Sequence, residues 1–271
     1  MNVTPKTSAD TPLARADVEG VALLSLNRPA ARNTLSEATL AALTASLSEI
    51  AEDRSVRAVI LAATGPAFCA GHDMKEMTAR RSDSDRGRAY FKELMTKCSA
   101  VMQSIMRLPQ PVIAAVEGVA TAAGCQLVAT CDLAIASANA KFSTPGVHIG
   151  LFCSTPMVAL SRNVSAKHAM EMLLTGDMVS AEDAYRMGLV NRVVEPNKAQ
   201  DEAMAFARKI TSKSALTLKI GKEAFYRQRD MSIAQAYDYA VEVMTQNMMA
   251  RDAEEGIGAF IEKRDPRWED R

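Results

Sequence analysis

The stretch EGVATAAGCQLVATCDLAIAS, residues 117–137, decides the fold. The apolar run VIAAV at 112–116 leads into it as a buried strand, and small residues then form a turn. A helix opens around Ala123-Gly124, and a second strand follows at 133–137. A free backbone N–H at such a helix start can face a ligand oxygen.

A second stretch of the same kind is AFCAGHDMKEM, residues 67–77. An apolar strand ends, the chain turns at Ala70-Gly71, and a helix begins near Asp73. On its own this pattern is also typical of an ordinary tight turn between a strand and a helix. If two amides from the two turns point at one place, they form an oxyanion hole, which stabilises a thioester enolate or a tetrahedral oxyanion.

The order of elements along the chain predicts an α/β fold. Strands and helices alternate to about residue 150, as in parallel βα units, and the chain then becomes mainly helical. Residues 1–11 are predicted to be a disordered lead-in, 12–197 a core with the ligand site, and 198–271 a helical region. A methionine-rich face in that region suits contact with another subunit or, equally, packing within the chain. Residues 78–88 are predicted to form a mobile loop that shapes the ligand pocket.

Composition excludes several classes of protein. Lys+Arg and Asp+Glu both number 32, so a net charge of zero argues against a nucleic-acid partner and an anionic membrane surface. The five cysteines include no C-x-x-C pair, which predicts reduced thiols and no metal site. No dinucleotide glycine fingerprint is present, so we expect no cofactor. Without a membrane span or a signal peptide, we expect a cytoplasmic protein.

The two stretches together resemble the crotonase (enoyl-CoA hydratase/isomerase) superfamily. Further segments match the family in the same order along the chain, so the resemblance covers residues 12–270. These segments are LNRPAARNTLS (26–36), FSTPGVHIGL (142–151), LLTGDMVSAEDAYRMGLVNRVV (173–194) and EGIGAFIEKRDPRW (255–268). It implies a spiral of ββα units with a C-terminal helical oligomerisation region, assembled as a homotrimer or as a hexamer of two trimers. It also implies an acyl-CoA thioester as the substrate.

Site residues carry over by position. The resemblance implies oxyanion-hole donors at the backbone N–H groups of Ala70 and Ala123. The family usually has glycine at the second position, and an alanine keeps the donor if φ stays negative. The coenzyme A contacts that the resemblance implies are Arg28, Ala31, His72, Asp73, Met74, Phe260 and Lys263.

The chain departs from the family pattern where hydration chemistry is done. Hydratases place one glutamate after G-C and another after the proline of F-x-x-P; here those positions are Gln126 and Gly146. Glutamine can still hold water by hydrogen bonds, but neither residue can transfer a proton. Relatives with other chemistries carry nucleophiles or acids at the positions of His148, Cys153 and Ser154. The alternative interpretation of these residues is structural: a hydrogen-bonded histidine, a core thiol and a helix cap, respectively.

Three functions therefore stay open. The first is an enzyme acting on acyl-CoA thioesters through the oxyanion hole, with decarboxylation or thioester hydrolysis easier than hydration. The second is an acyl-CoA-binding pseudoenzyme or regulatory module, and the third, disfavoured by the charge, is a nucleic-acid binder. The segments ATAAGCQLV and GLFCSTP (150–156) resemble the subgroup of the third enoyl-CoA hydratase domain-containing protein of animals, and no reaction follows from that likeness.

Overall fold

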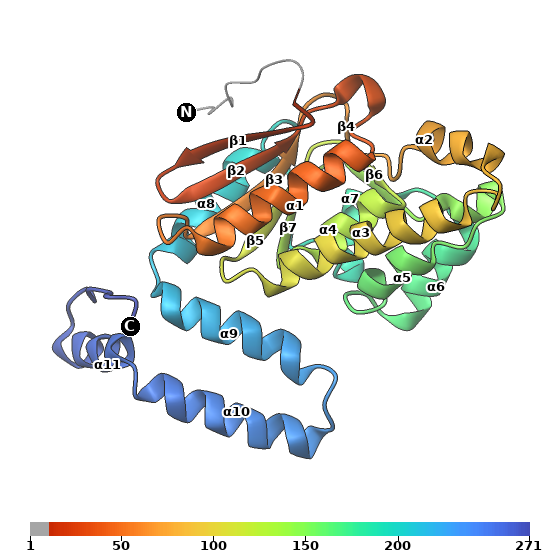
Figure 1. Ribbon diagram of the computed structural model, residues 1–271. Coiled ribbons are helices and arrows are strands. Elements are labelled where there is room, and N and C mark those ends of the chain that lie inside the picture. Colours follow the sequence, from red (N-terminus) through yellow and green to blue (C-terminus); the bar gives the residue numbers. More distant parts are fainter. Residues whose placement is uncertain (1–10) are drawn as a thin grey trace.

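The computed structural model describes residues 11–271 (Figure 1). The predicted disordered lead-in, 1–11, lies outside the described residues except for Thr11. No helix in the described part is both long and apolar enough to cross a bilayer.

Two sheets form the body of the molecule. The larger has the order β1-β2-β3-β5-β7-β10, in which β1 and β2 form an antiparallel hairpin and the other neighbours are parallel. The smaller has the order β4-β6-β8-β9, with only the last pair antiparallel. The strands are β1 Leu13–Val18, β2 Val21–Leu26, β3 Ala58–Ala63, β4 Ala67–Cys69, β5 Val112–Val116, β6 Val119–Thr121, β7 Leu133–Ser137, β8 Lys141–Ser143, β9 Val179–Ser180 and β10 Arg192–Val194.

The strand order shows the repeated ββα unit that the resemblance implied. β3 and β4 are followed by α2 (Met74–Ala79), and β5 and β6 by α4 (Ala123–Thr130). In each unit the first strand joins the large sheet and the second joins the small one. The second strands β4 and β6 are parallel neighbours, so the two chain turns that follow them leave the same edge of one sheet.

The large sheet is buried on both faces because its strands are apolar at nearly every position. Along β2, Ala22, Leu24 and Leu26 enter the main core, which α1 (Glu37–Glu52) and α3 (Arg88–Arg107) cover. The intervening Val21 and Leu23 enter a second cluster with alanines of α8 (Ala199–Thr211). The strand therefore carries two cores on opposite faces.

Helices occupy most of the remaining chain. They are the 3-10 helices η1 Pro29–Ala31, η2 Arg80–Ser82 and η3 Pro145–Ile149, and the α-helices α5 Ser154–Leu160, α6 Ala166–Thr175, α7 Ala181–Met187, α9 Ala215–Gln228, α10 Ile233–Met248 and α11 Arg251–Glu262. The segment 78–88, predicted as a loop, contains the end of α2, η2 and the first residue of α3. Two cation–π contacts, Arg80 over Tyr90 and Arg81 over Phe91, hold it against α3.

The last three helices extend away from the sheets (Figure 1). The division at 197/198 stays a prediction, although α8, which it assigned to the helical region, packs against the large sheet. A buried ion pair fixes α9: Lys222 Nζ lies 2.6 Å from Asp132 Oδ2 and also donates to the carbonyls of Ile105 and Gln110. Tyr226 donates its hydroxyl to Asp132 Oδ1 at 2.8 Å. Asp132 therefore has a structural role, because it joins α9 to the body of the molecule.

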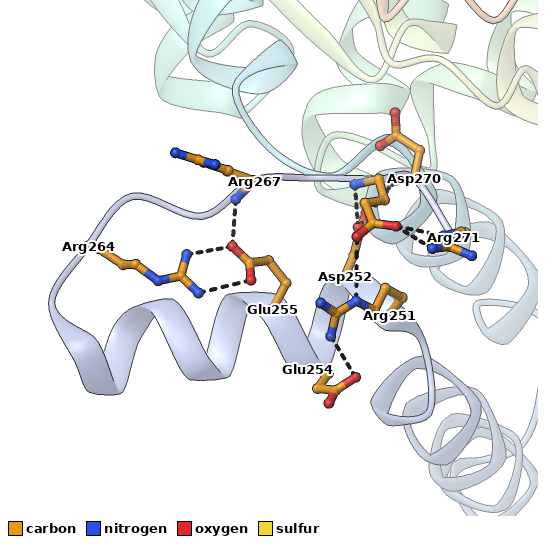
Figure 2. A network of polar contacts seen from close by, with 9 residues as sticks. Arg251, Asp252, Glu254, Glu255, Arg264, Arg267, Asp270 and Arg271 are labelled. Atoms are coloured by element: carbon orange, nitrogen blue, oxygen red, sulfur yellow. Dashed lines mark hydrogen bonds and ion pairs between the residues drawn. The ribbon is translucent and has the colours of Figure 1, made fainter.

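The segment after α11 folds back along that helix (Figure 2). Asp252 is buried and accepts the backbone N–H groups of Glu269 and Asp270. Glu255 receives two hydrogen bonds from the Arg264 guanidinium, at 2.6 and 3.0 Å. These bonds hold the pKa of Glu255 at about 2.

Candidate acyl-thioester site

The turns that follow β4 and β6 meet at Gly71. This residue has φ +94°, which suits glycine, and a Cβ added to it would lie 3.0 Å from Ala122 Cβ and 3.5 Å from Ala123 N. Behind the turns, a Cβ on Gly124 would lie 2.1 Å from the Cys69 carbonyl oxygen, so only glycine allows α4 to start this close to β4. The sequence-predicted stretches 67–77 and 117–137 are thus in direct contact.

The N–H of Ala123 has no acceptor within residues 11–271, and its nitrogen lies at this junction. Ala123 is the first residue of α4, whose first-turn N–H groups have no partner within the helix. The preceding amide, of Ala122, donates to Ser143 O at 2.9 Å, and Gln126 N–H donates to Ala122 O. Ala122 itself carries φ +50° and ψ −119°, so the strained residue of the turn is the one before the donor.

The prediction that Ala70 supplies an oxyanion-hole donor is wrong. Its N–H donates to the carbonyl of Arg32 at 3.1 Å and is not available to a ligand. Two residues on, the N–H of His72 has no acceptor within residues 11–271, although His72 pairs with Leu35 in a parallel bridge in which Leu35 N–H donates to Gly71 O. Sequence reasoning missed His72 as a donor because the pairing of 32–35 with 70–72 is a long-range contact with no local pattern.

Gln126 lies one helical turn after Ala123. The residue is 5% exposed, and its Oε1 is buried with no hydrogen-bond partner within residues 11–271. A buried amide oxygen without a donor is unfavourable by about 1–3 kcal/mol, so the position is suited to a hydrogen-bonding ligand group. Gln126 Oε1 is therefore a buried acceptor that the described part of the chain leaves without a donor.

Gly146 lies in η3, and no room for a side chain remains beside it. A Cβ there would lie 2.6 Å from the carbonyl oxygen of Leu151 and 2.9 Å from Cys153 Sγ. Burial raises the pKa of Cys153, although the Gly146 N–H opposes that shift, and it raises the pKa of the neighbouring Cys125 to about 12. A neutral thiol thus occupies the space that a side chain at 146 would need.

Several residues predicted to contact coenzyme A lie beside the same turn. The Arg28 guanidinium is 3.7 Å from Asp73 Oδ2, so the LNRP turn, which continues into η1 with Ala31, meets the start of α2. The Asp73 carboxylate caps α2 by accepting N–H groups of Lys75 and Glu76, and also accepts the Thr34 hydroxyl. It is therefore a structural group. Met74 follows it and is exposed.

Three predicted residues are not part of this group within one chain. Phe260 and Lys263 lie at the end of α11, on the opposite side of the molecule from α2 (Figure 1). His148 is exposed, and its Nε2 faces the Thr175 carbonyl at 2.8 Å. The glutamate of the stretch 67–77, Glu76, accepts the N–H of Glu37 at 3.0 Å and thereby caps α1. No cluster of residues within 11–271 has the ligand set of a metal ion.

Comparison with known proteins gives the family. The model of the enoyl-CoA hydratase/isomerase family matches residues 17–271. The chain belongs to this family. A crystal structure of an enoyl-CoA hydratase from Mycobacterium smegmatis superimposes with a TM-score of 0.90 at 53% identity, covering 95% of this chain and 98% of that one. The crotonase fold predicted from the sequence is confirmed.

Proteins of the subgroup predicted from the sequence are also similar to this chain. Human enoyl-CoA hydratase domain-containing protein 3 matches in its crystal structure with a TM-score of 0.90 and 45% identity, over 95% of this chain and all of that one. The rat protein of that name is 45% identical over 92% of this chain and 82% of its own length. The short-chain-enoyl-CoA hydratase of Clostridium acetobutylicum is 37% identical, over 90% and 92% of the two chains.

These relatives correct one expectation. The lack of a membrane span and of a secretory signal predicts a cytoplasmic protein. The rat, human and mouse relatives are mitochondrial proteins by name, which contradicts that expectation. A mitochondrial address is read from amphipathic, arginine-rich character, so the lack of a secretory signal was the wrong criterion.

Proposed function

We propose that this family member binds acyl-CoA thioesters with the carbonyl oxygen between the N–H groups of Ala123 and His72, and stabilises the enolate that forms there. The observation that carries the proposal is the contact of the two turns at Gly71. Ala123 N, whose hydrogen has no acceptor in the described part of the chain, lies 3.5 Å from the position that a Cβ on Gly71 would take. Two fixed backbone donors at a developing oxyanion need no reorganisation during the reaction. Arg28, whose guanidinium lies 3.7 Å from Asp73 Oδ2, and Ala31 in η1 would contact the coenzyme A.

Hydration is not the reaction that this site favours. Each general acid or base contributes about 10²–10⁴ to a rate, and Gln126 and Gly146 supply neither. The crowding at Gly146 by Leu151 O and Cys153 Sγ also leaves no place for a carboxylate from that position. Chemistry that depends mainly on the stabilised enolate or oxyanion, such as decarboxylation or thioester hydrolysis, remains within reach of the two amides.

The same crowding supports a second candidate, an acyl-CoA-binding module without catalysis. A thiol with a raised pKa and an amide side chain take the places of two titratable carboxylates. Such a site would hold a thioester through the backbone donors and leave it unchanged. The two candidates differ in turnover and agree on binding.

We further propose assembly as a homotrimer or as a hexamer of two trimers. The helices that extend from the body carry large exposed apolar side chains, which a single chain leaves in water. These are Phe225, Ile233, Tyr237, Val241, Met244, Met248, Met249, Ile257, Phe260 and Ile261. A neighbouring copy would bring Phe260 and Lys263 to the coenzyme A side of the site, and light scattering with cross-linking tests the stoichiometry.

The binding test compares two ligands and two proline variants. Butyryl-CoA has the thioester carbonyl, and its thioether analogue, S-butyl-CoA, lacks it. Calorimetry should show that the thioester binds about fivefold more tightly, because one or two hydrogen bonds to the carbonyl oxygen contribute about that much affinity. Ala123→Pro removes the donor N–H at a first helical position, where proline is tolerated, and should abolish that preference. Ala166→Pro, at the first position of α6, is the matched control and should retain it.

Turnover is followed with crotonyl-CoA, whose conjugated thioester absorbs in the ultraviolet. We expect no hydration over hours at micromolar protein. Malonyl-type and saturated thioesters are then screened for decarboxylation and hydrolysis. Rapid formation of 3-hydroxybutyryl-CoA would refute the assignment, because other groups would then replace the two carboxylates.

A further inference from the structure

An enolate needs a group that removes and returns a proton, and most titratable groups near the two turns are committed elsewhere. Asp73 caps α2 and faces Arg28, and Glu76 caps α1. Burial raises the pKa values of the Cys125 and Cys153 thiols, which keeps both neutral. Among these neighbours, the imidazole of His72 is the remaining candidate.

The ring of His72 is held in one orientation. It lies on the turn that also supplies the His72 N–H, and its Nδ1 faces the carbonyl of Leu35 at 3.4 Å. A carbonyl can only accept, so Nδ1 carries the proton and Nε2 keeps its lone pair. Leu35 is itself fully buried in the main core and bridged to the same turn, which fixes the carbonyl that selects this tautomer.

The Nε2 atom has nothing to bind within residues 11–271. It is buried and has no hydrogen-bond partner there, and the same holds for Gln126 Oε1 on the other turn. Burial also lowers the pKa of His72 below 6.5, which keeps the ring neutral at physiological pH. Two buried acceptors, one on each of the segments that meet at Gly71, are thus left without a hydrogen-bond donor by the described part of the chain.

We infer that His72 Nε2 is the general base and acid of this site, acting on the α-carbon of the bound thioester in place of the missing carboxylates. The α-carbon–hydrogen bond breaks and a bond from Nε2 to that proton forms. The released electron pair enters the bond between the α-carbon and the carbonyl carbon, and the carbonyl π pair moves to the oxygen. The imidazolium then returns a proton to the α-carbon. This inference rests on the proposed thioester binding.

The test is hydrogen–deuterium exchange at the α-carbon of butyryl-CoA in deuterium oxide, followed by mass spectrometry. The wild-type protein should incorporate deuterium, because the imidazolium exchanges its proton with solvent before returning it. His72→Gln keeps the backbone N–H, so it should still bind butyryl-CoA, and at saturating butyryl-CoA it should exchange about 10²-fold more slowly. His168→Gln, which alters a histidine on α6, should exchange at the wild-type rate.

A second variant separates chemistry from folding. His72→Ala should lose exchange and regain part of it when imidazole is added to the solution, which a purely structural histidine would not show. Wild-type exchange retained in His72→Gln would overturn the assignment of His72. The assignment of His72 would also be overturned if the wild-type protein bound butyryl-CoA and showed no exchange. The proposed binding function would stand in that case. Failure of the wild-type protein to bind butyryl-CoA would instead remove the proposed function itself.

Discussion

Replacing Ala122 with glycine should stabilise the protein, although it deletes a methyl group. The alanine is held at φ +50° and ψ −119°, a region that costs a residue with a Cβ about 1–3 kcal/mol. Glycine gives back about 0.5–1 kcal/mol through its greater freedom in the unfolded chain. The methyl is only partly buried, so its loss costs less than the ~0.8 kcal/mol of a fully buried group. The balance is a gain of about 1 kcal/mol in the free energy of unfolding.

The assay is urea denaturation followed by circular dichroism, at a fixed protein concentration so that any assembly contributes equally. Ala123→Gly is the matched control, because this neighbour has helical backbone angles and a buried methyl. Its glycine should destabilise the protein by about 1–2 kcal/mol. If both variants lose stability to the same extent, Ala122 is not strained and the geometry assigned to the donor turn is wrong.

Three further changes test other parts of the structure. Lys222→Met leaves the Asp132 carboxylate without its cation and should lower the free energy of unfolding by about 3 kcal/mol in urea denaturation, with Lys219→Met as an exposed control; a loss below 1 kcal/mol would contradict the buried pair. Gly146→Glu must displace Leu151 O or Cys153 Sγ and should cost about 1–3 kcal/mol without restoring crotonyl-CoA hydration, even beside Gln126→Glu; wild-type stability would refute the crowding. Burial lowers the pKa of His72 below 6.5, so the unfolded chain takes up the proton more readily and the protein loses stability as the pH falls through 6.5 and below. His72→Gln should make the denaturation midpoint fall less steeply with decreasing pH. An unchanged dependence of the midpoint on pH would contradict a buried, neutral His72.

Much of the fold could be predicted because its signals are local. The Glu19-Gly20 hairpin, the Ser36 cap of α1 and the buried strands at 58–62 and 112–116 follow from turn chemistry, capping and apolar runs. The assignment of α8 to the helical tail shows the limit of this approach. Its alanines at 199, 203 and 207 pack on the large sheet. A helical pattern of apolar residues predicts that one face is buried, but it does not indicate the surface against which that face packs.

The site could be predicted only as far as its segments. The stretches around Gly71 and Ala123 were found from their small residues and helix starts, and they are in contact. The choice of Ala70 failed because the carbonyl that occupies its N–H comes from Arg32, 38 positions earlier. The absence of space at Gly146 likewise depends on the return of the chain at Leu151 and Cys153, which composition does not reveal.

The parallel pairing of β4 with β6 has a consequence for how such a site can change over evolutionary time. Adjacent strands lie about 4.8 Å apart whatever side chains they carry, so the separation of the turns that follow them is set by the backbone of the sheet. Side chains such as Gln126 can then be exchanged by single mutations without moving the two amides proposed to bind the thioester carbonyl. A lineage can in this way lose one reaction and acquire another while its recognition of thioesters persists.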